Sequence, residues 1–504
     1  MKPFLARLSF IVTGWLVAGG ALHGATEAFD FEILRSRAKA LAAKPYVAPR
    51  STVPPELLKL TFSQHRAIAF NATRAWWKRD KLPFQLQFFH PGFIFGQTVV
   101  LHELRGREAT LIPFSKGFFS YGTDDYGNIP EDMGFSGFRI ISKLDRPEDE
   151  IGAFQGASYF RLLCLKTVYG LSARGLAVNP GDSVLGEEFP MFEEFWVQRP
   201  AGRDKAIVIF ALLNGPSIAG AYRFSILPGA VTVAQVKAVL YARTAIQTLG
   251  IAPLTSMFWH GESSNSLSGD YRPEVHDSDG LMIARGNGER LWRPLSNPDT
   301  RIRTSAFSDE NPKGFGLLQR DRDFEHYQDL QVAYQSRPSV WVEPMGAWGR
   351  GSVRLLELHT PDETNDNIAA FWVPDSLPPV GEPIELEYKL HWFMDQIKPP
   401  VAHVVATRMG ASRTHDTDLQ HFWVDFDSAY LRGLPPDTGM EAVVHVEAGA
   451  KLIYNGPQKN PYNGTWRISF GIRPDGSKKP VELRCFLRKD TAVLSEMWTY
   501  LWQP

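Results

Sequence analysis

The stretch from Glu385 to Trp392 carries the pattern that most limits the fold of this chain. In ELEYKLHW, apolar and polar residues alternate strictly, so every second side chain falls on one face: Leu386, Tyr388, Leu390 and Trp392. A period of two is typical of a β-strand with one face in a core and the other more polar. Such strands are common in antiparallel sandwiches, so the pattern favours an all-β protein.

Other segments repeat this pattern. FQLQFF (Phe84–Phe89) alternates and then meets the turn residues His90-Pro91-Gly92, and short strand-like runs separated by Gly and Pro follow for some three hundred residues. An aromatic fraction of 12% also favours a β-rich chain. Two segments predict helices instead, Phe31–Ala43 and, with a weaker pattern because of its β-branched residues, Val231–Leu249.

A length of 504 residues predicts two domains. The stiff Lys398-Pro399-Pro400 lies in a predicted linker, residues 395–402, which would divide a large β-sandwich (29–394) from a smaller domain (403–504). The last hundred or so residues contain short strands separated by turn clusters. Their spacing indicates an immunoglobulin-like sandwich.

The N-terminus predicts a secretory signal over residues 1–28. Lys2 and Arg7 precede a short apolar run, Leu8–Leu22, and small residues allow cleavage after Ala25 or Ala28. The alternative is an uncleaved anchor, but the run is short for a membrane span, so we expect no spanning segment after signal removal.

Composition narrows the partners and the chemistry. The formal net charge of −1 gives no basic field for nucleic acid. The two cysteines, Cys164 and Cys485, lie in apolar runs far apart and predict buried free thiols. His276 beside Asp277 and Asp279 is too tightly spaced for a usual zinc set, and no dinucleotide loop occurs, so we predict neither a metal nor a cofactor.

Carboxylates, arginines and tryptophans gather between Phe258 and Trp372, with Gly and Pro between them. Aromatic rings stack on sugar faces, polar side chains bond hydroxyls, and two acids can cleave a glycosidic bond. The segment therefore predicts a sugar-binding cleft, although loop acids on an ordinary β-domain would look the same. The run DRDFEHYQD (Asp321–Asp329) either lines this cleft or forms a salt-bridged surface turn.

Two acidic loops are candidates for the chemistry. Glu363 and Asp366 lie in ETNDN before an apolar strand, and Asp277 and Asp279 lie in HDSDG. An inverting glycosidase needs a protonated acid and a base about 6.5–9.5 Å apart. Sequence alone leaves open whether these loops meet, or whether the acids only cap their turns.

Longer motifs carry a family resemblance. They include FWHGE (258–262), FHPGFIFGQTVVLHEL (89–104), AFNATRAWWKRDKLPFQLQFF (69–89) and FQGASYFR (154–161). With the acidic motifs, they resemble the periplasmic glucan biosynthesis protein family of Gram-negative bacteria (OpgG/MdoG and OpgD, glucan biosynthesis proteins G and D). The resemblance implies a large N-terminal β-sandwich similar to galactose mutarotase and a C-terminal immunoglobulin-like domain.

The resemblance also implies roles. Some members are anomer-inverting endo-β-1,2-glucanases, and matching their motifs puts the general acid on Asp366, a supporting acid on Glu363 and the base on Asp277, with Asp279 as the fallback. Tyr334 matches a substrate-side tyrosine.

The remaining substrate-binding predictions are Arg337, Asp279 and several tryptophans. Five tryptophans of the acidic region are candidate sugar platforms, and we expect about half of them to be core residues instead: Trp259, Trp292, Trp341, Trp348 and Trp372.

Three functions remain open for a periplasmic protein of this kind. The first is hydrolysis of β-1,2-glucan, the backbone of osmoregulated periplasmic glucans. The second is transglycosylation in the same cleft. The third is a non-catalytic glucan-binding scaffold that works with an inner-membrane glucosyltransferase.

Overall fold

The computed structural model describes residues 26–122, 126, 128–264, 269–299, 302–411 and 418–504. About 47% of the chain is strand and 9% is helix. The sheets are mostly antiparallel, which confirms the predicted all-β sandwich class. Most of the predicted signal lies outside the described residues.

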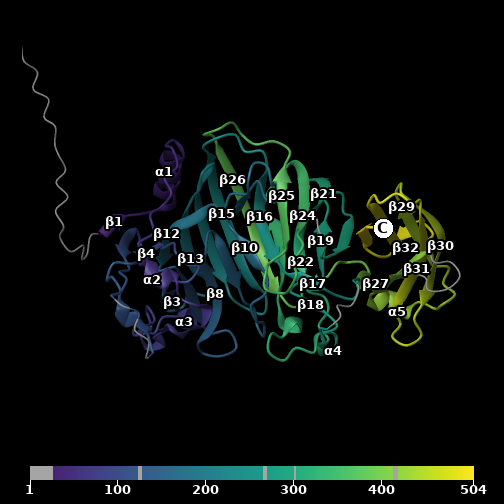
Figure 1. The fold of residues 1–504 in the computed structure, drawn as a ribbon, viewed down its shortest axis with the longest axis horizontal. Helices are drawn as coiled ribbons and strands as arrows, with labels where there is room; N and C mark the ends of the chain where they lie inside the picture. Colours follow the sequence, from purple (N-terminus) through teal and green to yellow (C-terminus); the bar gives the residue numbers. More distant parts are fainter. Residues whose placement is uncertain (1–25, 123–125, 127, 265–268, 300–301, 412–417) are drawn as a thin grey trace, which may run out of the picture.

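In the described part of the chain, one sheet of sixteen strands runs the length of the molecule (Figure 1). From edge to edge it contains β1 (Thr26–Ala28), β5 (Glu108–Leu111), β4 (Val100–Arg105), β12 (Met191–Gln198), β13 (Ile207–Asn214), β14 (Ile218–Leu227), β15 (Thr232–Ala242), β26 (Pro383–Phe393), β23 (Ser339–Pro344), β22 (Gly314–Leu318), β19 (Gly280–Ala284), β20 (Arg290–Pro294), β34 (Met497–Trp502), β32 (Val481–Lys489) and β29 (Glu441–Val446), with β33 (Ala492–Val493) beside β32.

A second sheet forms the other layer. Its strands are β21 (Arg303–Glu310), β24 (Arg350–Glu357), β25 (Ile368–Pro374), β16 (Leu249–Ser256), β10 (Ser172–Arg174), β9 (Tyr159–Leu162), β8 (Asp149–Gln155), β7 (Gly137–Ser142) and β3 (Phe84–Phe89), with β11 (Leu176–Val178) beside β16. Aromatic contacts join the two layers. Phe154 of β8 meets Phe195 of β12 with ring centroids 5.7 Å apart, and Phe160 of β9 meets Trp392 of β26 at 6.0 Å. Burial of these large rings is a main source of the stability of the sandwich.

Two sequence predictions have opposite outcomes in this region. The helix predicted over 31–43 is present as α1 (Phe31–Ala42), and it begins where the Asp30 side chain accepts the N–H of Ile33 at 2.8 Å. The helix predicted over 231–249 is wrong, because Thr232–Ala242 forms strand β15 between β14 and β26. Buried and half-buried residues alternate along the first half of β15. This period of two and the β-branched residues favour a strand over the predicted helix.

The strand predicted from ELEYKLHW is β26, where Tyr388, Leu390 and Trp392 are buried. The two cysteines are free and buried, as predicted. Further short elements complete the described fold: α2 (Pro55–Leu58), α3 (Phe62–Ala67), α4 (Phe324–Tyr327), α5 (Ala429–Gly433), and the strand pairs β2 (Ala69–Phe70) with β6 (Phe119–Ser120) and β17 (Phe258–His260) with β18 (Val275–His276).

The C-terminal region, residues 403–504, lies at one end of the molecule (Figure 1). It contains a sheet of β27 (His403–Ala411), β28 (Gln420–Asp427), β31 (Trp466–Pro474) and β30 (Ala450–Lys459), while its other strands, β29, β32, β33 and β34, extend the large sheet. The extension is a parallel pairing of β20 with β34, and Trp292 and Trp341 share one hydrophobic core with C-terminal residues such as Phe422. The predicted division at 395–402 stays a prediction, since this segment joins β26 to β27 while the large sheet continues past it.

Candidate active site

The HDSDG and ETNDN loops meet at the short strand β17. The backbone N–H of Asp277 donates to the carbonyl of Met257 at 2.8 Å. The side chain of Asn367 accepts the N–H of Phe258 at 2.8 Å and donates to its carbonyl at 3.0 Å. Two loops about ninety residues apart in sequence are therefore fixed to neighbouring residues, Met257 and Phe258, at the start of β17.

Asp277 and Asp366 lie in one electrostatic cluster with two arginines. Arg337 Nη1 is 2.8 Å from Oδ1 of Asp277, and Arg161 Nη2 is 3.8 Å from Oδ2 of Asp366. Burial raises the pKa of Asp277 to about 6 against the opposing charge of Arg337, and the nearby charge of Asp366 adds to the rise. Burial also raises the pKa of Asp366, while Arg161 and Arg337 lower it. The two carboxyl groups are thus coupled through the arginines.

The two aspartates differ in exposure. The side chain of Asp366 is 33% exposed, so it can contact a molecule that approaches from solvent. The side chain of Asp277 is 5% exposed and pairs with Arg337. The Asp366 carboxyl is therefore partly accessible to solvent, and the Asp277 carboxyl is buried.

Glu363 is held by hydrogen bonds from both sides. The hydroxyl of Tyr334 donates to its Oε2 at 2.6 Å, and Nη1 of Arg272 donates to the same atom at 2.6 Å. Tyr334 is buried, and the guanidinium of Arg337 lies 4.7 Å from the centre of its ring. The predicted residues Glu363, Tyr334 and Arg337 are thus connected to Asp277.

Arg272 is a member of this network that the sequence did not indicate. It pairs with Asp270 at 2.8 Å and Asp329 at 3.1 Å besides Glu363. Its guanidinium also lies 5.9 Å from the ring of Trp259. Its position in YRPE, just before the HDSDG loop, is the one sequence feature that places it near the acids. Arg161 is a second such residue, at the end of the motif FQGASYFR.

Asp279 belongs to a different environment from Asp277. Its Oδ2 accepts the backbone N–H groups of Arg320 and Asp321 at 2.7 and 2.8 Å. Burial raises its pKa to about 6, while the neighbouring His276 lowers it. Asp279 therefore holds the segment after β22, whose Arg320 donates to the Val404 carbonyl and to Glu496 of the C-terminal region.

The predicted aromatic platforms fall into two groups. Trp259 is half-buried and lines an open cavity. Trp292 and Trp341 are buried, with exposed fractions of 3% and 8%, and pack in the core shared with the C-terminal region. Trp372 is buried and Trp348 is half-buried, and the centres of their rings are 6.2 Å apart. Of these five tryptophans, only Trp259 contacts the acid network, by which we mean Glu363, Asp277 and Asp366 with their arginine and tyrosine partners. The contact runs through Arg272.

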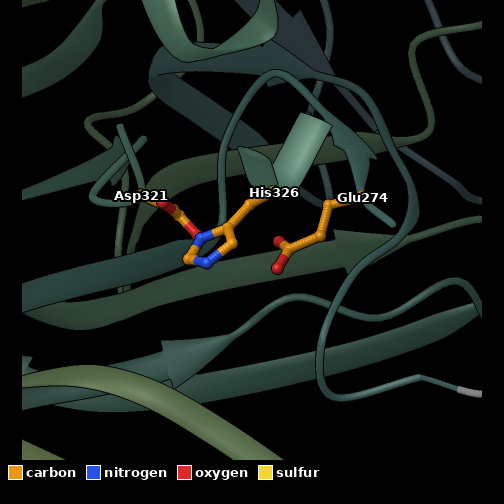
Figure 2. A group of neighbouring side chains, drawn as sticks. All are labelled: Glu274, Asp321 and His326. Carbon is orange, nitrogen blue, oxygen red and sulfur yellow. The ribbon is translucent and has the colours of Figure 1, made fainter. Parts of the chain in front are cut away.

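One group of described residues has the donor atoms for a metal ion. Side chains of Glu274, Asp321 and His326 point toward one another (Figure 2), and one ligand atom from each lies within 4.8 Å of the others. His326 Nδ1 is 2.5 Å from Asp321, and Glu274 is 2.8 Å from His276 Nε2. His326 and Asp321 therefore pair with each other, and Glu274 pairs with His276.

The comparisons with known proteins identify the family. The model of the family described as "Periplasmic glucan biosynthesis protein, MdoG" matches residues 29–502. The chain belongs to this family. It is 46% identical to "Glucans biosynthesis protein G" of Ralstonia nicotianae over 95% of this chain and 96% of that protein.

Two further relatives agree. "Glucans biosynthesis protein D 1" of Ralstonia nicotianae is 42% identical over 99% of this chain and 96% of its own length. "Glucans biosynthesis protein G" of Pseudomonas aeruginosa is 42% identical over 99% of this chain and 97% of its own length. The chain is therefore a protein of periplasmic glucan biosynthesis. Among its described residues, no helix is long and apolar enough to cross a membrane.

Proposed function

We propose that this protein cleaves linear β-1,2-glucan in the periplasm as an inverting endo-glucanase. The observation that carries the proposal is the coupling of Asp366 and Asp277, one half-exposed and one buried, through Arg161 and Arg337. Two carboxyl groups with raised pKa values in one cluster are typical of acid and base pairs in glycosidases.

Asp366 serves as the general acid in this proposal. Burial raises its pKa, which favours the protonated form needed to donate to the glycosidic oxygen. As that proton moves, the bond between the anomeric carbon and the bridging oxygen breaks. The leaving glucan chain departs with a new hydroxyl group.

Asp277 serves as the base. With a pKa of about 6, it is mostly ionised at neutral pH. A water attacks the anomeric carbon from the opposite face, forms the new carbon–oxygen bond and releases a proton. Because Asp277 is buried, we infer that this proton reaches it through a substrate hydroxyl or an intervening water.

Glu363, Tyr334 and Arg337 position these groups. Tyr334 and Arg272 hold the Glu363 carboxylate within the loop that carries Asp366. Arg337 packs on Tyr334 and pairs with Asp277, so it links the acid loop to the base. These residues would fix the two carboxyl groups on either side of the scissile bond.

The test is the conversion of β-1,2-glucan by the wild-type protein and by Asp366→Asn. We expect new reducing ends from the wild type, a loss of about 10²–10⁴ in rate for the variant, and an unchanged melting temperature. Rings or new linkages in the mass spectrum would indicate transglycosylation instead. Glucan binding without any product from the wild type would favour the scaffold that partners the membrane glucosyltransferase.

A further inference from the structure

A large open cavity lies where the C-terminal region meets the sandwich. Its volume is about 840 Å³, which is within the usual range for ligand-binding pockets. One wall comes from Trp259, Asn297 and Pro361, and the other from Lys478, Trp502 and Gln503. The cavity is therefore built by both parts of the chain.

The lining carries many hydrogen-bonding side chains, which suits a hydroxyl-rich ligand. Trp259 is half-buried and offers an aromatic face, whereas Tyr500 and Trp502 are buried in the core shared with the C-terminal region. Lys478 and Gln503 supply hydrogen-bonding groups. His260 also lines the cavity and is 3% exposed, and its Nε2 has no hydrogen-bond partner within the described residues. A buried polar atom without a partner is costly, so a ligand hydroxyl or a water would satisfy it.

The wall of the cavity is joined to the loop that carries Glu363. Pro361 in its wall is followed two residues later by Glu363, a span of at most about 7 Å along the chain. Asn297 donates to the carbonyls of both Trp259 and Thr360, at 3.2 and 2.9 Å. The wall of the cavity and the loop that carries Glu363 are thus one connected structure.

We propose that this cavity binds a further segment of the same glucan chain, beyond the sugars at the site of cleavage. The inference rests on the proposed function. It assigns the C-terminal region a role in holding long chains, through the exposed side chains of Lys478 and Gln503. Long glucans would contact both walls, whereas short oligosaccharides would reach only the acid cluster.

The test compares long and short β-1,2-glucans on matched variants. Lys478 and Lys479 are neighbouring exposed lysines, but only Lys478 lines the cavity. Binding is measured in an Asp366→Asn background, so that chains are not cleaved, and kinetics are measured in the otherwise unchanged protein. We expect Lys478→Ala combined with Gln503→Ala to weaken long-chain binding about tenfold through lost hydrogen bonds.

The controls separate this inference from the proposed function. The double variant should bind a short oligosaccharide as the parent does, and Lys479→Ala should leave both lengths unaffected. Equal affinity of the double variant and Lys479→Ala for long chains would overturn the cavity as a glucan site. A parent protein that binds no glucan of either length would overturn both proposals, and melting temperatures confirm that each variant is folded.

Discussion

Asp277 and Asp279 are two residues apart but belong to two different parts of the molecule. Asp277 pairs with Arg337 and is coupled to Asp366, on the side of the acid cluster. Asp279 accepts two backbone N–H groups and lies 3.8 Å from His276, on the side of the C-terminal region. Burial raises the pKa of each to about 6. A shifted pKa alone therefore does not distinguish a chemical role from a structural one.

The backbone explains the separation. The N–H of Asp277 bonds to Met257 beside β17, whereas the N–H of Asp279 bonds to Leu318 at the end of β22. The chain crosses from the small β17–β18 sheet to the large sheet within three residues, so the two side chains do not share one face. Acids that are close in sequence thus need not share a site.

The largest effect that tests this comparison is on turnover. Asp277→Asn should lower kcat on β-1,2-glucan by about 10²–10⁴, because the base is lost while the binding groups remain. Asp279→Asn keeps an oxygen that can accept the same two N–H groups, so its rate should stay within a few fold. Initial rates and melting temperatures are measured for both variants. If Asp279→Asn is inactive and Asp277→Asn is active, the base is Asp279 and not Asp277. If both variants are active, the HDSDG loop has a structural role and the base lies elsewhere.

A smaller effect is expected on the pH profile. Activity should fall below about pH 6 as Asp277 is protonated. Arg337 lowers the pKa of Asp277, so Arg337→Gln should move this acid limb to higher pH. Arg161 is the stronger influence on Asp366, so Arg161→Gln should mainly move the basic limb upward. Profiles of kcat/KM for both variants check the assignment, and identical shifts in the two would argue against separate acid and base.

Much of this arrangement followed from sequence patterns. The alternation in Glu385–Trp392 predicted β26. The acidic motifs predicted that the HDSDG and ETNDN loops carry the candidate catalytic acids. Other features depend on long-range packing that no local pattern carries. Trp292 looks like a sugar platform beside acids, yet β20 pairs with β34 and places it in a core. Arg272 joins Glu363 across ninety-one positions, which only the fold reveals.

The smallest expected effect is on the free energy of unfolding, through Glu262, which lies near Asp279 where the sandwich meets the C-terminal region. Glu262 in FWHGE accepts the backbone N–H of Thr407 and pairs with Arg408 at 3.2 Å, so it joins the sandwich to β27. Burial raises its pKa from an ordinary value of 4.5 to about 8, although Arg408 opposes the rise. Between these values the folded state holds more protons than the unfolded state. The free energy of unfolding should therefore decrease as the pH rises through this window.

Glu262→Gln cannot titrate, so its free energy of unfolding should fall less with rising pH than that of the wild type. Chemical denaturation at pH 5 and pH 8.5 measures this difference. His276 adds a decrease of the same sign that the substitution leaves in place. Its burial favours the neutral form, but Glu274 and Asp279 raise its pKa to about 9, and this stabilisation is lost as the pH rises through that value. Asp362→Asn is a matched control, because this half-buried acid lies on the loop with Glu363 and its side chain accepts only from Thr364 among the described residues. An unchanged pH slope in Glu262→Gln would show that Glu262 is already ionised in the folded protein, and the link to β27 would then be an ordinary ion pair with Arg408.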